Sequence, residues 1–211
     1  MPLTKTQAEG INLADTFAFT GTVTGAGDPA TLKLLKTINV SSPTATVEFI
    51  HGSNSVVFDG TYEQYIFEVI RALPATDTVQ VFMEITTDGG SNYKTGYNQY
   101  TTVSTRSYYN AVDSGANDSP SATDNIYGSS QQVSSDGDRG GFYCSLKITK
   151  PTTSQMHSFF GNANIHTDDN YSMVLNSHGT YDASVGTFNG FRFRFSSGNV
   201  ASGLFRLFGV V

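Results

Sequence analysis

The last stretch of the chain, Phe188-Asn-Gly-Phe-Arg-Phe-Arg-Phe-Ser-Ser-Gly-Asn-Val-Ala-Ser-Gly-Leu-Phe-Arg-Leu-Phe-Gly-Val-Val211, decides the fold class. Its first half alternates phenylalanine with Arg192 and Arg194, which is the period-two pattern of a half-buried strand. Ser197-Gly198-Asn199 follows, and Gly and Asn tolerate the left-handed backbone that a turn needs. The stretch therefore predicts two strands joined by a turn.

The second of these strands is apolar on both faces. One face carries Phe205, Leu207 and Val211. The other face is interrupted by Arg206 and carries the residues that we predict to form a subunit contact, Leu204, Phe208 and Val210. A strand that is apolar on both faces is covered on both, so we expect it to end inside a sheet. We expect a homotrimer with this strand at the contact; alternatively, the second sheet or the N-terminal arm of the same chain covers the outer face.

Composition is typical of a β-rich protein with many turns. The 211 residues suit one all-β domain with a short arm, and they include 21 Gly, 15 Phe and 11 Tyr. A net charge of −6 argues against nucleic-acid binding. The single cysteine, Cys144, excludes an intramolecular disulfide and fits a small core residue. We find no membrane-spanning run and no signal peptide, so we expect synthesis in a cytoplasm without membrane insertion.

The regular pattern begins at residue 32. Residues 1–31 contain a short helix candidate and a stretch rich in Gly, and we interpret them as an N-terminal arm or attachment segment, with an edge strand and a loop as the alternative. Residues 32–211 form the predicted domain. A short helix is the alternative for 32–40, because Leu32, Leu35 and Lys36 also fit a helical period. The expected strands before the terminal pair are 32–40, 44–50, 62–72, 79–87, 97–103, 142–150, 156–164 and 171–177.

Many short strands with turn signals between them predict an antiparallel, jelly-roll-like β-sandwich. Asp88-Gly89-Gly90-Ser91 is a strong hairpin-type turn. Residues 104–140 are the least regular, with one weak strand expected near 125–133, and a loop of this length is usually functional. We therefore regard Tyr108 and Tyr109 as candidate surface contacts, and a packed loop as the alternative.

No motif points to catalysis. The four histidines, His51, His157, His166 and His178, have no metal-pair spacing and fit polar sheet or loop positions. Two oxygen-rich clusters could bind a hard cation weakly, although turn chemistry explains both, and they are centred on Asp136 and Asp138 and on Asp168 and Asp169. We expect no catalytic residue, no cofactor and no metal.

Several short motifs resemble those of small structural proteins of tailed bacteriophages, many of them marine. Ser202-Gly203-Leu204-Phe205-Arg206-Leu207-Phe208-Gly209 resembles their SG-x-x-RLYG ending, with Phe208 in place of the usual Tyr. Phe58-Asp59-Gly60-Thr61-Tyr62-Glu63-Gln64-Tyr65 resembles their F-D-x-T-Y-x-x-Y entry into a strand. Further similar segments are Leu73-Pro74-Ala75-Thr76-Asp77, Asp88-Gly89-Gly90-Ser91-Asn92-Tyr93 and residues 10–23.

The resemblance implies a virion structural protein without catalytic residues. We expect a tail fibre or tail-tip component that is attached to other virion proteins through its arm and contacts the host surface, with a host glycan as a candidate partner. One alternative is a capsid decoration (cement) protein that stabilises the phage head, and a second is a soluble carbohydrate-binding module. The small size and the lack of a repetitive shaft favour the capsid alternative slightly.

Overall fold

The structure is a computed structural model that describes residues 32–95, 100–108, 116–123, 126, 132–151, 157–167, 172–181 and 187–211. For 100–108 and 116–123 the backbone alone is described. The chain divides into two units, Met1–Ala30 and Thr31–Val211, and every described residue lies in the second. The predicted arm, residues 1–31, lies outside the described residues.

The described residues form eleven strands and no helix, which confirms the predicted all-β class. The strands are β1 (Leu32–Val40), β2 (Val47–Ile50), β3 (Gln64–Pro74), β4 (Val81–Thr86), β5 (Tyr100–Tyr108), β6 (Ala116–Thr123), β7 (Gly141–Thr149), β8 (His157–His166), β9 (Ser172–Tyr181), β10 (Gly190–Phe195) and β11 (Val200–Val210).

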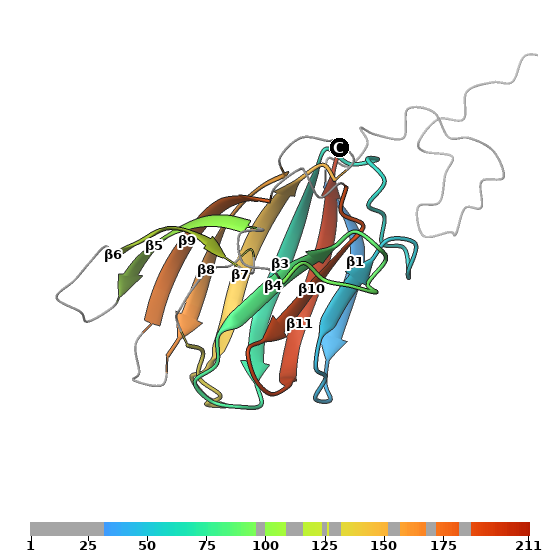
Figure 1. The fold of residues 1–211 in the computed structure, drawn as a ribbon. Coiled ribbons are helices and arrows are strands. Elements are labelled where there is room, and N and C mark those ends of the chain that lie inside the picture. Colours follow the sequence, from blue (N-terminus) through green and yellow to red (C-terminus); the bar gives the residue numbers. More distant parts are fainter. Residues whose placement is uncertain are drawn as a thin grey trace, which may run out of the picture. The chain divides into compact units, whose positions relative to one another are not determined.

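Two antiparallel sheets build the domain (Figure 1). The large sheet has the order β1-β11-β3-β7-β8-β9-β5-β6, and the small sheet has the order β2-β10-β4. Every adjacent pair runs antiparallel, so the predicted antiparallel β-sandwich is confirmed. The jelly-roll detail is not confirmed, because the strands divide eight and three between the sheets.

Aromatic rings from both sheets meet in the core. The ring of Phe67 on β3 lies 5.4 Å from that of Phe49 and 4.6 Å from that of Phe191, both on the small sheet. Phe193 on β10 contacts Phe205 on β11 with ring centroids 5.1 Å apart. The small sheet therefore packs on the β1–β11–β3–β7 part of the large sheet, as Figure 1 shows for β4 and β10 in front of β3 and β11.

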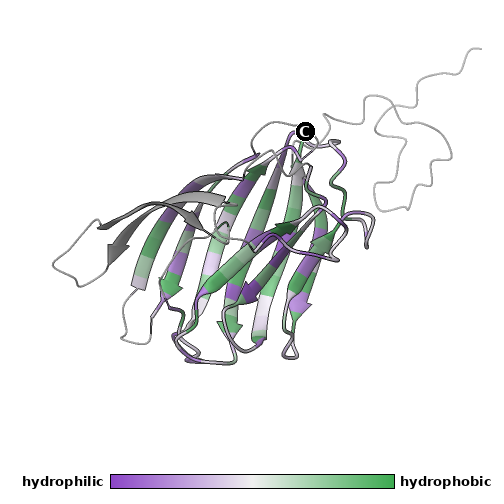
Figure 2. Ribbon diagram, viewed as in Figure 1, coloured by the Kyte–Doolittle hydropathy of each residue, from purple (hydrophilic) through white to green (hydrophobic). Residues whose placement is uncertain are grey.

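Hydrophobic and hydrophilic residues alternate along the strands, as expected where one face of a sheet is covered (Figure 2). On β10, Phe191, Phe193 and Phe195 are buried, whereas Arg192 and Arg194 are half-buried. Cys144 is buried and reduced, in agreement with its interpretation as a core residue, and this burial raises the pKa of its thiol.

Residues 32–40 form a strand and not the alternative helix. β1 pairs with β11 and contains an irregularity between Leu34 and Lys36. One extra residue in a strand shifts the alternation by one position, and Leu35 is consequently buried beside the exposed Leu34. This shift explains why the sequence spacing also fitted a helical period.

The turn at Asp88-Gly89-Gly90-Ser91 leads into a shorter return than expected. Thr86 forms an isolated bridge with Tyr93, and the backbone N–H of Lys94 donates to the carbonyl of Ile85 at 2.9 Å. The predicted strand 97–103 is corrected to β5, Tyr100–Tyr108, which lies in the large sheet between β9 and β6.

The region 104–140 is more regular than the sequence indicates. It contains the end of β5 and the whole of β6, Ala116–Thr123, a strand that its polar sequence did not predict. Of the expected strand 125–133, Val133 forms an isolated bridge with Val79, and most of the remainder lies outside the described residues.

Candidate functional site

The predicted contact residues share the outer face of β11. Leu204, Phe208 and Val210 are half-buried there, whereas Phe205 and Leu207 on the inner face are buried against the small sheet. β11 lies between β1 and β3, so the strand ends inside a sheet, as expected. The described strands form only the two sheets, and the small sheet packs on the inner face, so no described strand packs on this outer face.

Apolar residues of the neighbouring strands extend this face. Phe208 is paired with Leu34 on one side and Ile66 on the other, and cross-strand partners lie on the same face of a sheet. Leu32 and Leu34 are 48% and 51% exposed, which is high for leucine. We call the group the β11 patch, and its members are Leu32, Leu34, Ile66, Ile70, Leu204, Phe208 and Val210.

One ion pair interrupts the β11 patch. Arg206 on β11 is paired in register with Glu68 on β3, and its Nη1 atom lies 3.4 Å from the Oε2 atom of Glu68. Both side chains are partly exposed, so the pair contributes little stability on its own. Within the β11 patch, the carboxylate of Glu68 compensates the positive charge of Arg206.

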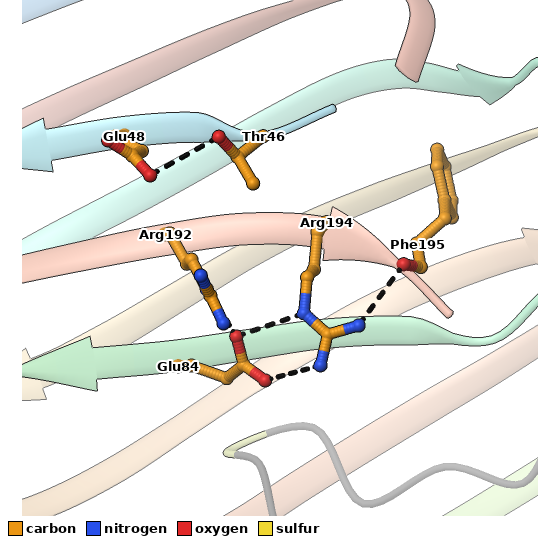
Figure 3. A network of polar contacts seen from close by, with 6 residues as sticks. All are labelled: Thr46, Glu48, Glu84, Arg192, Arg194 and Phe195. Atoms are coloured by element: carbon orange, nitrogen blue, oxygen red, sulfur yellow. Dashed lines mark hydrogen bonds and ion pairs between the residues drawn. The ribbon is translucent and has the colours of Figure 1, made fainter. Parts of the chain in front are cut away.

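The outer face of the small sheet holds a buried carboxylate between two guanidinium groups (Figure 3). The side chain of Glu84 on β4 is 1% exposed, and its oxygens accept from Arg192 Nε at 2.5 Å and Arg194 Nη2 at 2.6 Å. Arg192 stacks on the ring of Tyr93 at 3.8 Å, and Arg194 lies over the ring of Phe82 at 4.3 Å. This network joins β4 to β10, which is a structural role.

Two hollows adjoin at Tyr143, on the outer face of β7. The first has a volume of about 290 Å³, and its other lining residues are Arg71, Asp138, Arg139, Gly140, His166 and Thr167. The second is more open, and among its other lining residues are Glu68, Ile70, Ser145, Asn162, Asn164 and Val174. We call the two hollows together the Tyr143 groove.

Local backbone irregularity places Arg71 in this groove. Arg71 has a φ of +51° at a register shift in β3, between Val69 and Ala72. The facing strands are irregular at the same level, with φ +124° at Gly141 on β7 and +153° at Gly203 on β11. A bulge re-aims a side chain, and a positive φ is rare for a residue such as arginine.

The loop that forms one wall is tightly anchored. The backbone N–H of Gly140 donates to the carbonyl of Asp136 at 2.7 Å, and that of Ser134 donates to the carbonyl of His166 at 2.9 Å. The backbone N–H of Ser135 donates to a carboxylate oxygen of Asp77 at 2.7 Å, and this bond holds the pKa of Asp77 below its ordinary value. A Cβ at Gly140 would lie 2.3 Å from the carbonyl oxygen of Ser134, so only glycine fits there.

The two candidate cation clusters differ in what the structure describes. The carboxylate of Asp136 accepts from the backbone N–H of Asp138 at 2.8 Å, which is turn chemistry. Asp168 and Asp169 lie outside the described residues. Within the described ranges, no group of three or more His, Cys, Asp or Glu side chains is placed to hold a metal ion.

The two tyrosines and four histidines that the sequence singled out lie in different parts of the structure. Tyr108 is the last residue of β5, not a loop residue, whereas Tyr109 lies outside the described residues, so their role as surface contacts stays a prediction. The Nδ1 atom of His51 accepts from the backbone N–H of Phe58 at 2.9 Å. His157 and His166 are the ends of β8, and His178 is exposed on β9.

No protein-family model, curated protein or solved structure matches the chain. In the part of the chain that the structure describes, no helix is long and apolar enough to cross a membrane.

Sequence reasoning missed the Tyr143 groove. Its residues come from β3, β7, β8 and the loop before β7, so no local motif unites them. One signal was present: Tyr143 is an aromatic residue on the face of β7 that otherwise carries Ser145, Lys147 and Thr149. A single aromatic residue on a polar sheet face is common, so this signal alone did not locate the groove.

Proposed function

We propose that the chain is a non-enzymatic structural protein of a tailed-bacteriophage virion, a tail fibre or tail-tip component that is attached through residues 1–31 and contacts the host surface. The observation that carries the proposal is the β11 patch, an apolar sheet face of Leu34, Phe208 and Ile66 with no described strand over it. The resemblance of the sequence motifs to phage structural proteins supports the same assignment.

The β11 patch suits an interface between copies of this chain. Fully burying a leucine or phenylalanine side chain contributes roughly 1.5–3 kcal/mol. Leu34 is exposed and Phe208 is half-buried, so an interface that covers them would gain part of this free energy. Several such residues per chain can outweigh an association cost of about 4–15 kcal/mol. Closed symmetry is the usual result of such contacts, and a threefold axis suits a fibre head.

A capsid decoration protein is the second candidate, because a threefold contact through the β11 patch suits a capsid cap as well as a fibre head. The two roles make different predictions for the number of copies in each virion. A tail component is present in small multiples of three or six, whereas a decoration protein is present in hundreds of copies.

The test is quantitative mass spectrometry of purified virions, with the major capsid protein and a tail-tube protein of the same phage as internal standards. A low copy number that follows the tail after heads and tails are separated supports the tail assignment. Hundreds of copies that follow the head support decoration. Absence of the chain from purified virions contradicts both.

A further inference from the structure

We propose that the Tyr143 groove binds an acidic saccharide, with the carboxylate of one sugar residue in the hollow beside Arg71 and the chain of further sugars along the second hollow. The site is a property of the fold, and this inference rests on the proposed function only for the source of the saccharide, a host surface glycan.

The first hollow has the size of a site for one sugar residue. Its volume of about 290 Å³ is at the lower limit of roughly 300–1,000 Å³ that is usual for small-molecule pockets. The ring of Tyr143 provides apolar surface on one side, 6.3 Å from the ring of His166 between centroids. An aromatic ring beside polar groups is the composition that holds a sugar, whose ring has an apolar face and a polar edge.

Arg71 is held in position for a carboxylate. One of its Nη atoms donates to the carbonyl of Gly137, which uses one of the five N–H donors of a guanidinium group. Its φ of +51° is maintained by the bulged strands around it, and strained backbone of this kind clusters at binding sites. A guanidinium fixed in this way binds a carboxylate with little further loss of conformational entropy.

Among its described lining residues, the hollow holds one carboxylate, that of Asp138, beside two arginines, Arg71 and Arg139, and this carboxylate favours a saccharide over a bare anion. Asp138 lines the same hollow as Arg71. A carboxylate repels any anion, the carboxylate of a sugar included, but it also accepts hydrogen bonds from sugar hydroxyl groups, and a bare anion does not offer several such donors. A ligand with one carboxylate and several hydroxyl groups, such as a uronic acid, satisfies Arg71 and Asp138 together.

The second hollow continues the site along the sheet. Asn162 and Asn164 line it from β8, together with Ser145 from β7. Side-chain amides both donate and accept, so they suit the hydroxyl groups of further sugars. The amide of Asn162 also donates to Asn176 on β9, which orients it on the sheet face.

The experiment compares two monosaccharides that differ in one group. Methyl β-glucuronide carries a carboxylate where methyl β-glucoside carries a hydroxymethyl group, and inorganic phosphate serves as the bare anion. Backbone amide NMR spectra of the ¹⁵N-labelled full chain are recorded with each probe up to about 20 mM, well above the millimolar Kd expected for a single sugar. We expect the glucuronide to shift amides of residues 138–143 and 166–167, with the glucoside at least about tenfold weaker.

Matched variants separate the contributions. Arg71→Gln and Tyr143→Ala should each weaken glucuronide binding about tenfold or more, because they remove the charged donor and the ring. Tyr143→Phe keeps the ring and should bind like wild type. Lys33→Gln removes an equal charge from an exposed position on β1 and should also bind like wild type. Unchanged spectra of remote amides in each variant show that it is folded.

Three results overturn the inference: no amide shift with the glucuronide, shifts that map outside the groove, or equal binding of phosphate and the glucuronide. None of these results bears on the copy number of the chain in the virion, so the inference and the proposed function fail separately.

Discussion

The ring of Tyr62 lies directly against Gly209, so that a Cβ at Gly209 would come within 2.4 Å of the Cγ atom of Tyr62. The two residues belong to the two most distinctive motifs of the sequence, Phe58–Tyr65 and Ser202–Gly209. Tyr62 is 5% exposed and precedes β3, whereas Gly209 is near the end of β11, the neighbour of β3 in the large sheet. The glycine at this place is therefore explained by packing, since an aromatic ring occupies the space of a side chain.

We expect Gly209→Ala to lower the free energy of unfolding by about 1–3 kcal/mol, because the added methyl group overpacks the site. Equilibrium unfolding in urea measures the change. In a Tyr62→Ala background, Gly209→Ala should lower the free energy of unfolding by clearly less, because the space for the added methyl group is then open. Gly137→Ala is the control, because no atom lies within 4 Å of a Cβ there, and it should change stability by less than about 0.5 kcal/mol. An equal cost of Gly209→Ala in both backgrounds would refute the contact.

The second prediction concerns the carboxylate of Glu84, which is 1% exposed between Arg192 and Arg194. Glu84→Gln should lower the free energy of unfolding by about 3 kcal/mol, because it leaves two adjacent cations without a counter-charge. Glu48→Gln is the control: Glu48 faces Arg192 from β2 but is exposed, so its loss should cost less than about 1 kcal/mol. Similar midpoints of urea unfolding for the two variants would contradict the structural role of the network.

The third prediction tests the β11 patch as a subunit contact. Wild-type protein at micromolar concentration should be a trimer by light scattering, and Phe208→Asp should dissociate it because a charge enters an apolar contact. Leu34→Asp should act in the same way, since Leu34 is paired with Phe208 and is already 51% exposed. Ser158→Asp adds the same charge at an exposed position of β8 and should remain trimeric. A monomeric wild type, or a Phe208→Asp protein that stays trimeric, would exclude this contact.

The fourth prediction is the pH dependence at the turn after β4. Hydrogen bonds from the side chain and backbone of Asn92, and from Thr86, lower the pKa of Asp88 from 3.8 to about 2. Because the folded-state pKa lies below the unfolded value, the stabilising contribution is fully present above about pH 4 and is lost as pH falls toward 2.

An NMR titration of the Asp88 carboxyl group should therefore have its midpoint near pH 2. Asn92→Ala removes the largest of these interactions and should move the midpoint up toward 3.8. Asn54→Ala, in a loop elsewhere, should leave it unchanged. A midpoint near 3.8 in the wild-type protein would contradict the hydrogen bonds at this turn.

Much of the secondary structure is legible in the sequence because strand alternation is a local property. The alternating Phe and Arg residues of β10, the two-sided apolar pattern of β11 and the pattern of β7 each identify a strand and its buried face. β6 was missed because its sequence, Ala116–Thr123, is polar and includes Pro120, so it has neither the apolar period nor the composition of a strand.

Which strands pair was decided by tertiary structure. The turn at Ser197–Asn199 joins β10 in the small sheet to β11 in the large sheet, although adjacency in the sequence favours a hairpin. Whether β10 and β11 pair with each other or lie in different sheets depends on contacts with other parts of the chain. Examples are Phe193 with Phe205 across the core and Phe208 with Ile66 within the large sheet. No local pattern contains these contacts.

The sequence by itself determined that the chain is a β protein and that Leu204, Phe208 and Val210 share one face of its last strand. The Tyr143 groove was decided by the tertiary structure alone. Arg71 reaches it from a bulge in β3, Asp138 from a loop and His166 from the end of β8. Residues so far apart in the sequence are brought together only by strand register and by the direction of side chains at an irregular backbone, and both are properties of the assembled sheet.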